Sequence, residues 1–380
     1  MTDIAAAALY QRLAEDAPPR ILDVRNAEEF ARWRVEGPHP IDVLNVPYFE
    51  FVEREEASVR KVADWIGGRT DDLVVVCAEG GSSAYVAEIL QGRGLPTVNL
   101  AGGMVAWGLG TTARPVTASG PVRLWQVLRF GRGCLSYVVA RGEDAIVVDA
   151  HRGLDAYRAL LDQEGLHLRA VFDTHLHADH VSGGPALARG GGVSYHASPR
   201  DFEGASVPVE ELVENRPVRI GRLEVIPIVP LATPGHTPGS TSLLVGDAFL
   251  LTGDTLFVDD VGRPDLGGQA ATWARDLHRT LHERLRPLGD EVVVLPAHAS
   301  GHAGPGAAGA LAGVLGDLRS RNRAMQLDLD AFVREAEHAA GSAPPEYAKI
   351  RAINLGRETA PETELTELEL GKNQCALSRR

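Results

Sequence analysis

Cysteine is scarce in this sequence, and long apolar runs are missing from it. The three cysteines, Cys77, Cys134 and Cys375, lie far apart and are odd in number. This pattern argues against a disulfide framework and predicts a reducing, cytoplasmic setting. No apolar run reaches the roughly 18 residues that a membrane span needs, so we expect no membrane segment. The alanine-rich residues 4–13 have no basic start and are followed by acidic residues, so we expect no secretory signal.

Positive charge is also in deficit. The chain has 38 Lys and Arg residues against 51 Asp and Glu residues, which gives a formal net charge of −13. Such a chain repels polyphosphate backbones, and no basic stretch with interleaved aromatics is present, so nucleic acid is not expected as a partner. A length of 380 residues with 44% hydrophobic and 23% charged content predicts a soluble protein of two domains.

The most informative stretch is residues 174–180, Thr-His-Leu-His-Ala-Asp-His, which directly follows the apolar run Leu168–Phe172. On an extended segment, residues i and i+2 project the same way, so we expect His175 and His177 to face one metal ion together. Asp179 and His180 follow where we expect a helix to begin. A histidine cluster of this kind, placed after a strand, predicts a metal site.

Three further candidate ligands follow along the chain. His236 lies in a Gly/Pro turn, Asp254 ends an apolar strand, and His298 follows the apolar residues 293–297. Each is a weak signal alone, because a lone histidine in a loop is more often structural. In this order after the first cluster they are a strong signal.

This motif, His-x-His-x-Asp-His followed by His236, Asp254 and His298, resembles the metallo-β-lactamase superfamily. The resemblance implies an αββα sandwich of two mixed sheets with metal between their edges. In its dinuclear zinc hydrolases, Asp254 would bridge two ions, one held by His175, His177 and His236, and the other by Asp179, His180 and His298. In its persulfide dioxygenases, one Fe(II) would be held by His175, His236 and Asp254, with His177, Asp179, His180 and His298 orienting those ligands.

The first part of the chain alternates short strands, at residues 20–24, 73–76 and 97–100, with helical patterns, which predicts a small parallel α/β sheet. Cys77 ends the most apolar strand, and a Gly/Ser-rich loop separates it from the next helix. Its thiol could therefore sit in a cradle of backbone N–H groups, which favours the thiolate. The alternative is a small buried structural cysteine.

Asp23-Val24-Arg25, the Cys77 loop and Ala101-Gly102-Gly103-Met104 resemble the rhodanese sulfurtransferases. The resemblance implies that Cys77 carries sulfane sulfur as a persulfide. Many rhodanese loops place cationic side chains beside this cysteine, and the loop here has none, which disfavours thiosulfate as the donor. The related phosphatases close the loop with an Arg at the position of Ser83, so a phosphatase is excluded.

Two features favour the dioxygenase. The segment 261–266, Val-Gly-Arg-Pro-Asp-Leu, is similar to one in persulfide dioxygenases, and Arg263 is a candidate clamp for the carboxylate of a thiol substrate. An Arg263–Asp265 pair that shapes the loop is the alternative. A fused sulfurtransferase also fits a partner domain that handles sulfane sulfur, although this is an argument from association.

We expect a rhodanese-like domain at residues 1–110, a linker at 111–121, a metal domain at 122–340 and an extension at 341–380. In the metal domain we expect a hairpin around residues 141–144 and helices near Leu154–Glu164, Thr272–Arg286 and Leu311–Arg323. The extension carries no motif that we can assign. We favour a solvated acidic face for it over a cover of the metal domain or a homo-oligomer contact.

Together these features predict a cytoplasmic, iron-dependent persulfide dioxygenase. It would oxidise a low-molecular-weight thiol persulfide, such as glutathione persulfide, with O2 to sulfite and thiol, and Cys77 would transfer sulfane sulfur. One alternative is a zinc thioester hydrolase that resembles glyoxalase II. Another is a non-catalytic sulfur carrier with a structural metal.

Overall fold

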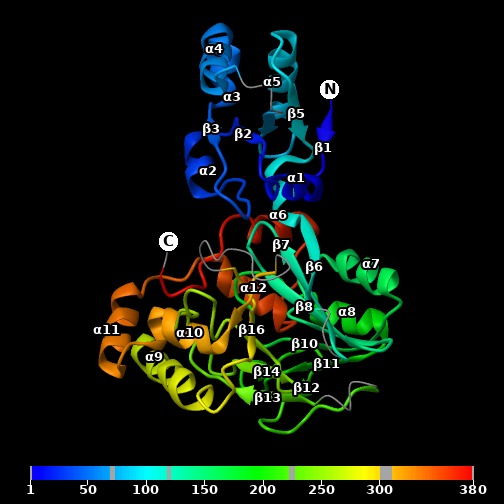
Figure 1. Cartoon of the computed structure of the whole chain (residues 1–380), viewed down its shortest axis with the longest axis vertical. Helices are drawn as coiled ribbons and strands as arrows, with labels where there is room; N and C mark the ends of the chain where they lie inside the picture. The colour runs from blue at the N-terminus through cyan, green and yellow to red at the C-terminus, as the bar shows by residue number, and fades with distance from the viewer. Residues whose placement is uncertain (1, 69–72, 118–120, 222–226, 300–309, 379–380) are drawn as a thin grey trace. The chain divides into compact units, whose positions relative to one another are not determined.

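The computed structural model describes residues 2–68, 73–117, 121–221, 227–299 and 310–378 (Figure 1). The chain forms two compact units. The first comprises Met1–Thr112 with the short segments Arg129–Gly131 and Leu370–Lys372, and the second comprises the remaining residues. Among the described residues, no helix has both the length and the apolar character needed to cross a bilayer.

The first unit is built on a parallel sheet of five strands, as the sequence predicted. Its order is β1-β5-β4-β2-β3, and every neighbouring pair is parallel. All four residues of the central strand β4 are buried, as expected for a parallel strand covered on both faces. The strands are β1 (Asp3–Ile4), β2 (Arg20–Asp23), β3 (Val43–Asn45), β4 (Leu73–Val76) and β5 (Thr97–Leu100). The helices are α1 (Ala6–Leu13), α2 (Ala27–Arg32), α3 (Tyr48–Glu53), α4 (Glu55–Ile66), α5 (Gly81–Gly92) and α6 (Gly103–Leu109).

The second unit is built on two mixed sheets. The seven-stranded sheet has the order β12-β11-β10-β9-β8-β7-β6, and the five-stranded sheet has the order β13-β14-β15-β16-β17. The first contains β6 (Thr111–Thr117), β7 (Arg123–Arg129), β8 (Leu135–Arg141), β9 (Asp144–Val148), β10 (His167–Phe172), β11 (Ser194–Ala197) and β12 (Glu210–Glu211). The second contains β13 (Ile228–Ala232), β14 (Thr241–Val245), β15 (Phe249–Gly253), β16 (Val293–Pro296) and β17 (Gly313–Val314).

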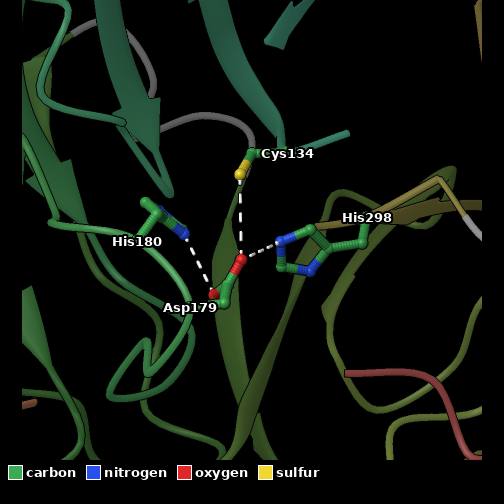
Figure 2. A group of neighbouring side chains, drawn as sticks. All are labelled: Cys134, Asp179, His180 and His298. Carbon is green, nitrogen blue, oxygen red and sulfur yellow. Dashed lines mark hydrogen bonds and ion pairs between the residues drawn. The ribbon is translucent and has the colours of Figure 1, made fainter. Parts of the chain in front are cut away.

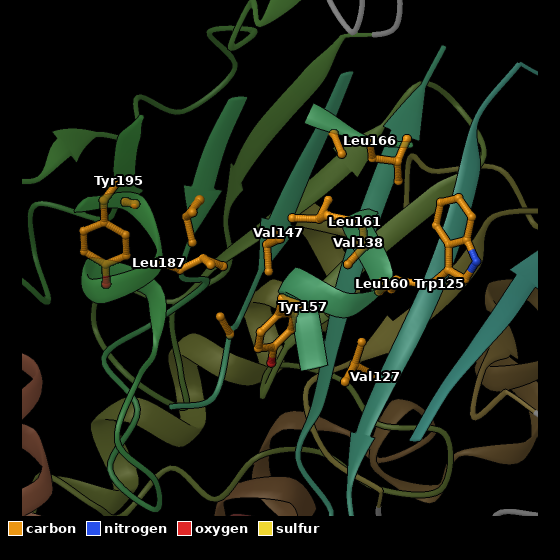
Figure 3. Close-up of a cluster of buried hydrophobic side chains, with 14 of the residues drawn as sticks. Trp125, Val127, Val138, Val147, Tyr157, Leu160, Leu161, Leu166, Leu187 and Tyr195 are labelled. Atoms are coloured by element: carbon orange, nitrogen blue, oxygen red, sulfur yellow. The ribbon is translucent and has the colours of Figure 1, made fainter. Parts of the chain in front are cut away.

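Three apolar clusters show that these sheets form the middle of an αββα sandwich. Successive strand residues point to opposite faces: Tyr137 of β8 packs in the cluster between the sheets, and Val138 packs in the outer cluster with α7 (Leu154–Glu164) and α8 (Gly184–Gly191) (Figure 3). The outer face of the five-stranded sheet is covered by α9 (Ala270–Arg279), α10 (Leu315–Arg321) and α11 (Leu329–Ala339). The predicted fold class is therefore confirmed.

Several element boundaries differ from those expected. The residues expected as a linker include β6, an edge strand, which is a position that tolerates proline such as Pro115; residues 118–120 lie outside the described part. The helix expected near Thr272–Arg286 is present as α9, which starts at Ala270 and continues directly into the π-helix Thr280–Arg284. The helix expected from Leu311 begins at Leu315, after β17.

The C-terminal extension was expected to be a solvated acidic face, and Glu358, Glu362 and Glu367 are exposed, but other residues of the extension are buried. It contains α12 (Glu346–Asn354) and α13 (Glu362–Leu368). Asn354 and Glu369 are buried, with 4% and 1% of their surface exposed. Both form hydrogen bonds with residues 177–181, so the extension covers part of the metal domain.

Candidate metal centre

The histidine-rich loop, residues 174–183, is fixed by side chains from other elements. Asp149, at the end of β9, accepts hydrogen bonds from Thr174 N and Oγ1 at 2.8 and 3.0 Å. Asn354 Nδ2 donates to the carbonyls of His177 and His180 at 2.9 and 3.0 Å. No helix starts at Asp179, although we had expected one there; α8 begins only at Gly184.

His175, His236 and Asp254 come together from three loops. His175 Nε2 lies 3.8 Å and His236 Nε2 lies 3.6 Å from Asp254 Oδ2. All three residues are only 1% exposed. His175 Nδ1 lies 2.9 Å from Thr174 Oγ1, and His236 Nδ1 donates to the Arg263 carbonyl at 3.0 Å. Partners on Nδ1 of this kind orient a histidine so that Nε2 faces a metal.

The chemistry of this set fits a divalent cation. Among the described residues, His175 Nε2 and Asp254 Oδ2 are buried without any hydrogen-bond partner. Burying a polar atom without a partner costs about 1–3 kcal/mol, and more for a charged oxygen. A cation bound between His175 Nε2 and Asp254 Oδ2 would give both atoms a partner and remove this cost. Two imidazoles and one carboxylate are also the donors that iron and zinc take in proteins.

His177 lies beside His175 and is also held by a carboxylate from another element. Its ring centroid lies 4.3 Å from that of His175, but its Nε2 lies 3.2 Å from Asp149 Oδ1, and it groups with Asp149 and Asp173. Its Nδ1 is buried without a partner among the described residues. His177 can therefore reach an ion shared with His175 only through Nδ1.

Asp179, His180 and His298 form a third set with Cys134 (Figure 2). Asp179 Oδ1 lies 3.1 Å from His180 Nδ1, and Asp179 Oδ2 lies 2.9 Å from His298 Nε2. The other ring nitrogen of His298, Nδ1, donates to Asp254 Oδ1 at 2.6 Å. The motifs in the sequence did not place Cys134 in the site, since none of them connects it with residues more than 40 positions away.

The pKa shifts of His175, His236 and Asp254, which we call the first set, favour the binding of a cation. Burial alone would raise the pKa of Asp254, but His298, and then His175 and His236, hold it far below its usual range. Burial lowers the pKa of His236, and burial together with His177 lowers that of His175. The set therefore offers a charged carboxylate and neutral imidazoles at neutral pH, as metal binding requires.

Arg263 is 1% exposed and forms the pair with Asp265 that we had considered as an alternative to a substrate clamp. Its Nη2 donates to Asp265 Oδ2 at 2.6 Å and to the Gly341 carbonyl at 2.9 Å, and its Nε donates to Asp265 Oδ1. Its Nη1 is buried without a partner among the described residues. A clamping role would therefore depend on Nη1.

Cys77, in the first unit, lies in a cradle of hydrogen-bond donors. Its Sγ accepts from Gly80 N at 3.0 Å, at the start of α5, and lies 3.1 Å from Ser83 Oγ, whose single hydrogen is shared with Asn99 Oδ1 at 2.7 Å. Gly103 has a φ of +55°, and a Cβ there would lie 2.3 Å from the Cys77 carbonyl, so only glycine fits. The cysteine is 5% exposed. A backbone N–H directed at the sulfur, with a hydroxyl beside it, suits a thiolate or persulfide.

Comparisons with known proteins identify the families that the two parts of the chain resemble. Residues 129–298 match the model of the metallo-β-lactamase superfamily, and residues 5–109 match that of the rhodanese-like domain. A hydroxyacylglutathione hydrolase of Anaeromyxobacter dehalogenans is 35% identical over 228 residues, which cover 60% of this chain and 82% of the relative. The mitochondrial persulfide dioxygenase ETHE1 of Mus musculus is 30% identical over 191 residues, which cover 48% of this chain and 70% of the relative.

A solved structure gives a similar result. The crystal structure of ETHE1 from Myxococcus xanthus superposes with a TM-score of 0.53 at 26% identity, over 61% of this chain and 98% of that protein. The similarity therefore covers the whole length of that protein.

Proposed function

Because this chain belongs to the metallo-β-lactamase superfamily and carries a rhodanese-like domain, we propose that it is an iron-dependent persulfide dioxygenase. His175, His236 and Asp254 would hold one Fe(II). A low-molecular-weight thiol persulfide, such as glutathione persulfide, would react with O2 and one water to give sulfite, the free thiol and protons.

The observation that carries this proposal is the pairing of Asp254. Its Oδ1 accepts from His298 Nδ1 at 2.6 Å, and its Oδ2 lies within 4 Å of both His175 Nε2 and His236 Nε2. One carboxylate oxygen is therefore in use, and the other remains for a metal. This favours a single ion at the first set over a pair of ions bridged by Asp254.

Fe(II) in this set would supply redox chemistry and open coordination positions for the substrate and O2. The chain itself supplies the rest of the site. Burial of the three ligands keeps bulk water out, and the hydrogen bonds to Thr174 and Arg263 hold the histidine rings in place. Arg263 Nη1 is the donor that could bind a carboxylate of the thiol substrate.

Cys77 would handle sulfane sulfur in the rhodanese-like domain. The Gly80 N–H, and the Ser83 hydroxyl when its hydrogen turns from Asn99 to the sulfur, would stabilise a negative charge there. A thiolate formed in this way can attack a sulfane sulfur without a separate general base. The step breaks the sulfur–sulfur bond of the donor, forms a persulfide on Cys77 and releases the donor thiolate.

A second candidate is a dinuclear zinc thioester hydrolase. It is favoured by the 35% identity to a hydroxyacylglutathione hydrolase and by the presence of further ligand groups beside the first set. Zinc would supply an activated hydroxide for attack on the acyl carbon.

Metal content and substrate choice separate the two candidates. Protein loaded anaerobically with Fe(II) should retain about one iron per chain and should not hydrolyse a glutathione thioester. Rapid hydrolysis of that thioester by the zinc-loaded protein would instead support the hydrolase, whatever its zinc content. Cys77→Ser is the matched control, because it should change neither result.

A further inference from the structure

Cys134 is held beside His298 by the backbone. The two residues form an antiparallel bridge, flanked by hydrogen bonds from Leu135 N to the Ala297 carbonyl at 2.7 Å and from Ala299 N to the Gly133 carbonyl at 3.0 Å. In this pattern Cys134 and His298 are a pair without direct backbone hydrogen bonds, whose side chains lie close together on one face. The sulfur and the imidazole are therefore positioned by the fold rather than by chance.

The side chains around Cys134 are arranged as metal ligands. Cys134, Asp179, His180 and His298 each offer one ligand atom, and all four atoms lie within 4.8 Å of one another (Figure 2). Cys134 Sγ lies 3.9 Å from Asp179 Oδ2. None of the four residues is more than 2% exposed. His180 Nε2 is buried without a hydrogen-bond partner among the described residues, while its Nδ1 is held by Asp179.

We propose that Cys134 is a metal ligand, and that with Asp179, His180 and His298 it forms a second metal site that takes a thiophilic divalent cation such as Zn²⁺. One thiolate and one carboxylate carry two negative charges, which a divalent cation balances when both histidines are neutral. Four donors of sulfur, oxygen and nitrogen match the tetrahedral coordination that zinc prefers. The thiolate favours zinc over hard cations such as Mg²⁺.

This site differs from the second site of a bridged dinuclear centre. There Asp254 would contribute to both ions, whereas here its Oδ1 is occupied by His298 Nδ1. Cys134 supplies the fourth ligand in its place. His298 then links the two sites, since its Nε2 faces the Cys134 set and its Nδ1 faces Asp254. A cation at the second site would strengthen the hydrogen bond to Asp254 and hold that carboxylate in one orientation.

X-ray absorption spectroscopy of the zinc-loaded, full-length protein tests the proposal directly. We expect a sulfur neighbour at about 2.3 Å from zinc, which disappears in Cys134→Ser and persists in Cys375→Ser. Cys375 is the matched control because it is a free cysteine, 1% exposed, in the same unit. A chelator competition should show zinc bound at least about tenfold more weakly at this site in Cys134→Ser. A sulfur neighbour that survives in Cys134→Ser would overturn the proposal.

A second variant covers the case in which Cys134→Ser does not fold. In the double variant Cys77→Ser/Cys375→Ser, Cys134 is the one remaining cysteine. Titration of this variant with Co²⁺ should produce the near-ultraviolet charge-transfer absorption of a thiolate–cobalt bond. Absence of that absorption would refute the assignment. The inference does not rest on the proposed oxygenase activity, and because both readouts report metal–sulfur bonds, a failure of oxygen uptake would leave them unchanged.

Discussion

Glu369 provides a sharp test of how the C-terminal extension supports the metal centre. Its side chain is fully buried, its Oε1 accepts from Val181 N at 2.7 Å and its Oε2 accepts from Arg152 Nε at 2.5 Å. Val181 directly follows the histidine-rich motif. In Glu369→Gln, an amide of the same shape has a single acceptor oxygen, so one of these two hydrogen bonds must be lost.

The size of the effect follows from these contacts. If the amide NH2 group faces Val181, a buried N–H loses its partner, which costs about 1–3 kcal/mol. If the NH2 group faces Arg152, the Arg152 guanidinium loses its most buried anion, although the guanidinium keeps its hydrogen bonds to Glu362 and Thr366. We therefore expect the loop to open about 5- to 150-fold more often, the equivalent of 1–3 kcal/mol.

Hydrogen exchange followed by mass spectrometry, on peptides that cover residues 174–183, measures this opening. Glu367→Gln is the matched control, because Glu367 lies exposed at the end of the same helix and its replacement removes the same charge. The control should stay within about 0.5 kcal/mol of wild type. Exchange in Glu369→Gln that is indistinguishable from the control would refute the reasoning.

Three further predictions follow from the site and the fold. Asp254→Asn should lose bound iron, because the neutral amide no longer balances the cation; metal analysis after gel filtration checks this, and full retention of iron would contradict it. Cys77→Ser should abolish sulfane-sulfur transfer to cyanide while oxygen uptake continues, and unchanged transfer would show that Cys77 is not the carrier. Burial, with His278 and Arg286, lowers the pKa of His282, so the unfolded chain binds this proton first and acidification through about pH 6.5 favours unfolding. His282→Gln should therefore lose less thermal stability than wild type between about pH 7.5 and 5.5, as scanning calorimetry would show.

Much of the fold could be predicted because its elements have strong local patterns. The apolar run Leu73–Val76 is strand β4 with the predicted bounds, and the amphipathic residues Leu154–Glu164 are helix α7. The order of His236, Asp254 and His298 after the first cluster pointed to the family, because it combines residue type with spacing. Edge strands such as β6 were harder to predict, since Pro115 and the Thr residues around it fit an edge strand and a loop equally well.

The contacts that complete the site could not be predicted from sequence. Asn354 lies 177 positions from His177, whose carbonyl it binds, and no local pattern connects two such residues. The spacing of His175 and His177 indicated that their rings share a side, and the rings do lie close together. Asp149, at the end of a different strand, pairs with Nε2 of His177. Only Nδ1 of that ring is therefore left for a metal, and the spacing of the two histidines could not predict this.

Oxygen uptake with sulfite formation tests the central claim most directly. Protein purified without oxygen and loaded with Fe(II) would receive glutathione persulfide in an oxygen-electrode vessel, and sulfite would be followed in the same sample. We predict that each O2 consumed yields one sulfite, and that both signals disappear in Asp254→Asn. An absence of uptake with iron confirmed on the wild-type protein would contradict the proposed activity on this persulfide.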